Sequence, residues 1–119
     1  MFEINVGSLL ESYTGDSQTL AFEGPVLPSL YEDLVIEGDL QFTLTIIAID
    51  DGVEAIVKNL TCLATYEDMT YDIEIEQFDR MFKLTPDPLA PDDVGFINTK
   101  NSTIDLGKVI REEILISII

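Results

Sequence analysis

The chain has 119 residues with 23 Asp or Glu against 6 Lys or Arg, which gives a formal net charge of −17 at pH 7. Nucleic-acid affinity comes mainly from Lys and Arg, and anionic lipids also recruit basic segments. We therefore expect no direct binding to nucleic acid and no membrane association. Because no positive charge occurs between Met1 and Val57, an electrostatic partner should be basic. The alternative is that the charge serves only solubility.

Histidine is absent and Cys62 is the single cysteine. A histidine-based triad, a histidine zinc site and an internal disulfide are therefore excluded. The sequence also lacks a Gly-rich phosphate loop and EF-hand spacing. Asp50-Asp51 and Asp92-Asp93 could each share a divalent ion, but Asp pairs favour turns. Because these motifs are absent, we expect a protein that is not an enzyme and carries no cofactor or metal. The N-terminus also lacks a secretory signal, so we expect the protein to be cytoplasmic.

The N-terminal quarter predicts short elements. Residues 2–6 alternate between apolar and polar, as a half-buried strand does. Ser8 and Glu11 then have the spacing of a capping box, which predicts a helical turn over residues 9–13. Residues 19–23 alternate again. This part of the chain should therefore contribute two strands and one helical turn.

The longest pattern of period two runs from Leu34 to Ile46. Only Gly38 interrupts its apolar side, and a glycine at such a place marks a bulge or a sharp bend. A turn at Asp50-Asp51-Gly52 follows, in which Gly52 is expected to supply the positive φ of a tight hairpin. Residues 53–65 form the returning strand of that hairpin.

A third long strand is predicted from Met69, after a turn at residues 66–68. Its apolar residues alternate with Thr70, Asp72, Glu74 and Glu76, so three carboxylates should line one solvent-exposed face. Sequential strands joined by tight turns pair antiparallel. The middle of the chain therefore predicts an antiparallel meander.

The C-terminal third contains a loop and a helix. Residues 83–95 hold three prolines and three aspartates, which predicts a mobile loop. Asp105 can cap a helix whose apolar residues recur at helical spacing, and residues 114–119 are almost wholly apolar, so they must be buried internally or against a partner. The chain thus predicts one α+β domain, residues 1–119, with a mainly antiparallel sheet, either a twisted meander or barrel-like, and a C-terminal helix.

Two segments resemble the YceD-like family, the large ribosomal RNA subunit accumulation proteins of bacteria and plastids. Ile104-Asp105-Leu106 opens a segment that continues through an acidic pair into an apolar run, as the family's C-terminal signature does. Cys62-Leu63 matches the end of the family's Cys-x-Arg-Cys-Leu strand, whereas Asn59 and Thr61 replace the first Cys and the Arg. The acidic strand and the Pro- and Asp-rich loop follow in the family's order.

The resemblance implies a non-enzymatic role in large ribosomal subunit biogenesis, through accumulation or maturation of 23S rRNA. It also suggests a partner, because ribosomal proteins are strongly basic and an acidic escort could shield one. Electrostatic attraction between an acidic and a basic surface accelerates association, and this attraction weakens as the salt concentration rises. The residues expected to contact the partner are Glu37, Asp39, Asp72, Glu74, Glu76, Glu112 and Glu113.

Two other functions are compatible with the composition. An acidic protein can mimic nucleic acid and occupy a basic cleft, which requires carboxylates spaced like phosphates. An enzyme could use paired carboxylates, as glycosidases do, although no cleft-forming signature accompanies them. Binding of a basic ribosomal protein or assembly partner is the leading hypothesis, with a nucleic-acid mimic or another protein-binding module as the alternative.

Overall fold

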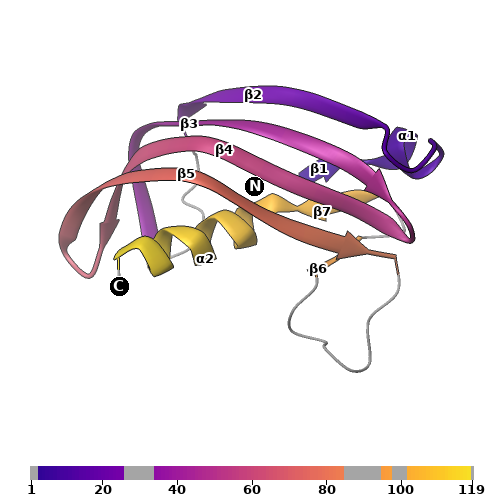
Figure 1. The fold of residues 1–119 in the computed structure, drawn as a ribbon. Coiled ribbons are helices and arrows are strands. Elements are labelled where there is room, and N and C mark those ends of the chain that lie inside the picture. Colours follow the sequence, from indigo (N-terminus) through magenta and orange to yellow (C-terminus); the bar gives the residue numbers. More distant parts are fainter. Residues whose placement is uncertain (1–2, 26–33, 85–94, 98–101, 119) are drawn as a thin grey trace.

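The computed structural model describes residues 3–25, 34–84, 95–97 and 102–118 (Figure 1). The elements in chain order are β1 (Glu3–Asn5), α1 (Gly7–Leu10), β2 (Ser17–Pro25), β3 (Leu34–Ile49), β4 (Gly52–Tyr66), β5 (Met69–Lys83), β6 (Gly95–Phe96), β7 (Thr103–Asp105) and α2 (Leu106–Ile118). The predicted loop at 83–95 falls mostly outside the described residues, although Lys83 belongs to β5 and Gly95 begins β6.

A five-stranded sheet with the order β2-β3-β4-β5-β6 dominates the fold. Strands β2 to β5 form an antiparallel meander, and the short β6 pairs parallel to the end of β5. Figure 1 shows this sheet curving over α2. The predicted α+β class with a mainly antiparallel sheet is therefore confirmed. Of the two predicted forms, the structure has the twisted meander, and the sheet does not close into a barrel.

Bulges in the long strands produce the curvature. Gly38 has a φ of +71°, and the β3–β4 register shifts between Glu37 and Gln41, as the sequence predicted. Asn59 is left-handed too, with a φ of +55°. Buried side chains on β4 are odd-numbered up to Val57 and even-numbered from Leu60. Such extra residues bend a strand and increase its twist.

The β3–β4 turn differs from the sequence prediction. Asp51 has the positive φ, +64°, and Gly52 does not. Asp tolerates this region because its short polar side chain can bond locally. Gly52 has another role, because a Cβ there would lie 2.0 Å from the carbonyl oxygen of Phe82. The glycine therefore permits close approach of β5.

The N-terminal helical turn also starts earlier than predicted. It spans Gly7–Leu10, and the Asn5 side chain accepts a hydrogen bond from the Gly7 N–H at 2.9 Å. The N-cap is Val6, which makes no side-chain cap hydrogen bond, so the predicted capping by Ser8 is wrong. Strand β1 pairs antiparallel with β7, which brings Glu3–Asn5 beside the start of α2.

The core lies between the sheet and α2. The buried residues of the helix recur at helical spacing: Leu106, Val109, Ile110 and Ile114. They pack with the inward side chains of β3, β4 and β5 in one hydrophobic cluster. The apolar residues at the end of α2 differ in burial: Ile114 is fully buried, whereas Ile116 is 65% exposed. No described helix is long and apolar enough to cross a membrane.

Candidate functional site

The face of the sheet opposite α2, which we call the outer face, carries most of the described acidic side chains of the strands. No described helix covers it (Figure 1). Its lysines are Lys58 and Lys83, and Lys83 donates from Nζ to the backbone oxygen of Asp50 at 3.2 Å. Its carboxylates, assigned by strand alternation and register, are Glu23, Glu37, Asp39, Glu54, Asp72, Glu74, Glu76 and Asp79. The outer face is therefore strongly negative.

The β-sheet register brings five predicted contact residues onto this one face. Glu37 of β3 is opposite Leu63 of β4, and Leu63 is opposite Asp72 of β5. Neighbouring strands lie about 4.8 Å apart, so Glu37 and Asp72 stand on either side of Leu63 at roughly twice that distance. Asp39 lies in the adjoining β3 bulge, and Glu74 and Glu76 continue along β5. The sequence prediction of an acidic group on one surface is consistent with this geometry.

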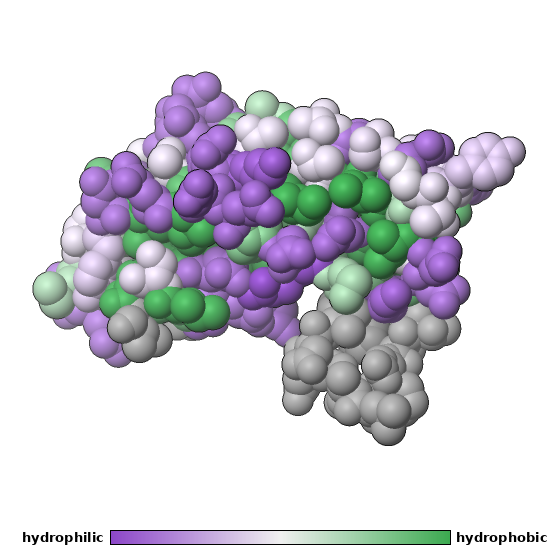
Figure 2. All heavy atoms as spheres, viewed as in Figure 1, coloured by the Kyte–Doolittle hydropathy of each residue, from purple (hydrophilic) through white to green (hydrophobic). Residues whose placement is uncertain are grey.

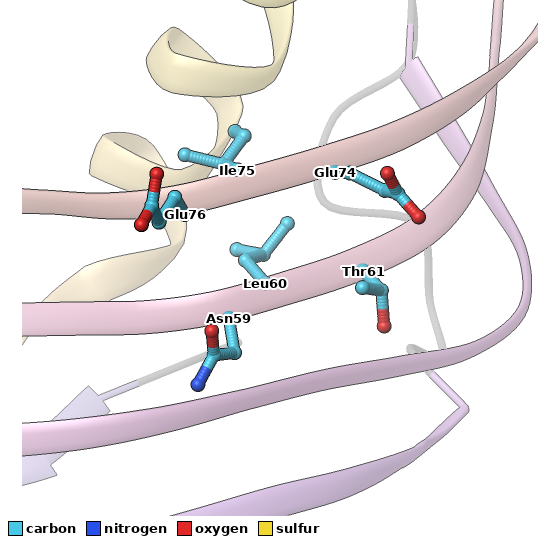
Figure 3. Close-up of a pocket in the computed structure, with 6 residues that line it drawn as sticks. All are labelled: Asn59, Leu60, Thr61, Glu74, Ile75 and Glu76. Atoms are coloured by element: carbon cyan, nitrogen blue, oxygen red, sulfur yellow. The ribbon is translucent and has the colours of Figure 1, made fainter.

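A hollow of about 380 Å³ lies where β4 and β5 bend together. Four of the residues that line it are polar, namely Glu74 and Glu76 of β5 and Asn59 and Thr61 of β4 (Figure 3). The left-handed φ of Asn59 keeps two consecutive β4 residues, Lys58 and Asn59, exposed. Carboxylate, amide and hydroxyl oxygens can all accept hydrogen bonds. The hollow can therefore receive a hydrogen-bond donor such as an ammonium or guanidinium group.

Apolar side chains interrupt the acidic surface. Leu63 is 46% exposed between the carboxylates of Glu37 and Asp72, and Met81 is 45% exposed nearer the β3–β4 turn. Ile47 and Ile56 are half-buried on the same face. Figure 2 shows such hydrophobic areas among the hydrophilic side chains. A partner could therefore make both apolar and ionic contacts here.

The two predicted contact residues on α2 do not belong to the outer face. Glu113 forms an ion pair with Arg80 of β5 and is only partly exposed. Glu112 is exposed, but α2 lies on the other side of the sheet (Figure 1). The sequence could show that these residues are acidic. It could not show which face of the sheet the helix covers.

The residues that carry the family resemblance have structural positions. Ile104 and Leu106 are fully buried, while the Asp105 carboxylate accepts a hydrogen bond from the Gly107 N–H at 3.0 Å and so caps α2. Cys62 points into the core, where burial, with a smaller contribution from the Asp72 charge, raises its pKa to about 11. Only Leu63 of this set reaches the outer face.

Sequence reasoning missed a carboxylate pair on the outer face. A hydrogen bond to Asp79 raises the pKa of Glu54, and partial burial and the Asp79 charge act in the same direction. The two residues lie on neighbouring strands, where Ile56 is opposite Asp79 and Glu54 is opposite Met81. Only the β4–β5 register reveals this diagonal contact. The pair adds two carboxyl groups to those that a basic partner could contact on the outer face.

Within the described ranges, no group of three or more Cys, Asp or Glu side chains is placed to hold a metal ion. The comparisons with family models, curated proteins and solved structures found no match. The resemblance to the YceD-like family therefore stays a prediction from the sequence.

Proposed function

We propose that the protein is a non-enzymatic, cytoplasmic binding module that holds a basic protein on its outer face. The observation that carries this proposal is the charge of that face, where eight carboxylates accompany two lysines and no described helix covers them. The family resemblance makes a ribosomal protein the first candidate partner. The role would then be in large ribosomal subunit biogenesis, supporting the accumulation or maturation of 23S rRNA.

The strength of such binding must come from several contacts together. An exposed ion pair contributes only about 0.2 to 1 kcal/mol. Several pairs along β5 and β3, with burial of Leu63 and Met81 against apolar side chains, can add to a stable complex. The ionic part accelerates association and weakens as salt screens it. Ribosomal RNA, which also binds basic proteins, would then displace the module.

Charge reversal on the outer face tests the proposal. The variant Asp72→Lys, Glu74→Lys, Glu76→Lys should lose the capture of basic ribosomal proteins from a lysate at low salt. A matched control reverses three exposed carboxylates elsewhere, Glu11→Lys, Asp16→Lys, Glu112→Lys, and so makes the same change in net charge. The control should keep most of the capture.

Three outcomes would count against this function. Equal capture by both variants would show that β5 is not the contact surface. Equal loss would show that only net charge matters. Tight binding of protein-free ribosomal RNA by the unmodified protein would contradict the role assigned to the charge. Competition with DNA for a nuclease, without capture of ribosomal proteins, would instead support a nucleic-acid mimic.

A further inference from the structure

Among the described residues, strand β5 has an unpaired edge along most of its length. Strand β6 pairs only with Phe82 and Lys83, and no other described strand lies beside residues 69–81 on that side (Figure 1). In an antiparallel pair, every second residue directs its backbone N–H and C=O away from the partner strand. The edge therefore offers a row of backbone donors and acceptors that can pair with an added strand.

The side chains along this edge alternate in chemistry. Asp72, Glu74 and Glu76 are exposed on the outer face. Tyr71 and Ile75 point to the other side, where they are half-buried and pack against the core. A strand added here would therefore place every second side chain beside carboxylates and the others beside partly exposed apolar groups.

A second copy of this chain fits the edge poorly. Pairing two β5 strands would bring two rows of carboxylates onto one face, and like charges on neighbouring strands are destabilising. The opposite edge of the sheet, β2, has Glu23 as its acidic residue. Charge thus selects a cationic strand at β5 and disfavours self-association there.

We propose that the partner contributes an extended segment in which Lys or Arg alternates with aliphatic residues, and that this segment joins the sheet along β5 at residues 70–76. Its cations face Asp72, Glu74 and Glu76, and one enters the hollow beside Asn59. Its aliphatic side chains cover Ile75 and Tyr71. This addition of a strand rests on the proposed function and specifies its mode of binding.

Two synthetic peptides of equal composition test the alternation. One, of about ten residues, alternates Lys and Val, and its isomer has all the Lys before all the Val. We expect the alternating peptide to bind the whole protein about tenfold more tightly in fluorescence anisotropy, since only it pairs the edge and both faces at once. Amide hydrogen exchange should slow within residues 70–76 when the alternating peptide is bound.

N-methylation of the peptide tests the backbone pairing without changing the protein. One further peptide is methylated on its Lys amides and another on its Val amides. Only the Lys amides or only the Val amides can point towards β5. The peptide methylated on that set should lose about tenfold or more in affinity, and the peptide methylated on the other set should retain its binding. Equal effects of the two methylation patterns would overturn strand addition.

The outcomes separate this inference from the function on which it rests. If the alternating and block peptides bind equally, or if exchange slows elsewhere than in residues 70–76, strand addition is wrong and charge-based binding stands. If neither peptide binds at low salt, both the mode and the proposed function are wrong.

Discussion

The two faces of the same sheet have opposite roles. On β4, Leu60, Cys62 and Ala64 face α2 and are buried, while Thr61 and Leu63 between them face outward. The inner face contributes the hydrophobic cluster, and none of the described residues is a buried polar or charged one. The outer face carries the carboxylates. Strand alternation thus separates, within one strand, the residues that stabilise the fold from those available to a partner.

This difference indicates that the acidity is not required by the fold. Like charges in one row, such as Asp72, Glu74 and Glu76, oppose one another and add nothing to burial. An exposed leucine between two acidic positions also contributes little to stability. We therefore expect changes on the inner face to alter the free energy of unfolding, and changes on the outer face to alter binding.

A pair of leucine substitutions on β4 gives the largest expected effect. Leu60→Ala removes a fully buried side chain and should lower the free energy of unfolding by about 2 to 5 kcal/mol, since it leaves a cavity in the core. Leu63→Ala, three residues away and 46% exposed, should change it by about 0.5 kcal/mol or less. Urea unfolding of both variants measures the difference. Similar losses would break the distinction between the faces.

A pair of glycine substitutions tests how closely the strands approach. Gly52→Ala places a Cβ against the Phe82 carbonyl and should destabilise the protein by about 1 to 3 kcal/mol, because β4 and β5 must shift apart. Gly24→Ala is the control, since no atom of the described residues lies within 4 Å of its added Cβ. Thermal unfolding should show a clear decrease for the first variant only. An unchanged Gly52→Ala would contradict the close approach.

Periodicity was sufficient to predict strands β1 to β5, the C-terminal helix and the Gly38 bulge, but not the short strands β6 and β7. Local chemistry was less reliable where two residues could do the same task. Asp51 took the positive φ expected of Gly52, and Ser8 does not cap α1, whose N-cap is Val6 and whose Gly7 N–H bonds to Asn5. Asp51 and Asn5 are both Asx residues, whose side chains bond to nearby backbone.

The candidate site could be predicted only in part, because some of its features depend on how strands and the helix pack together. The sequence alone predicts that Asp72, Glu74 and Glu76 lie on one face, because alternate residues of a strand point to the same side. Their proximity to Glu37 depends on strand register, and the exclusion of Glu113 depends on where α2 packs. Those are long-range relations that no local pattern contains. The Asn59 bulge and the hollow beside it required the structure as well.

The inner position of Cys62 predicts a pH effect on stability. Its pKa is raised from 9.0 to about 11 in the folded protein. The protonated thiol therefore contributes stability that is fully present below pH 9 and is lost as the pH rises towards 11, on the order of 1 to 2 kcal/mol. Unfolding free energies measured across this window should fall more steeply for the unmodified protein than for Cys62→Ala. Parallel pH profiles would mean that the thiol is not buried as described.

The smallest expected effect links the two faces. Asp72 lies on the outer face, yet its charge helps to raise the pKa of the inward Cys62 thiol, after the larger effect of burial. Asp72→Asn should therefore lower that pKa by less than about one unit, and the thiol should react faster with an alkylating reagent near pH 9. Glu74→Gln, two residues along the same strand, is the control and should leave the rate unchanged. Equal rates in all three proteins would show that the inner face does not sense the charge of the outer face.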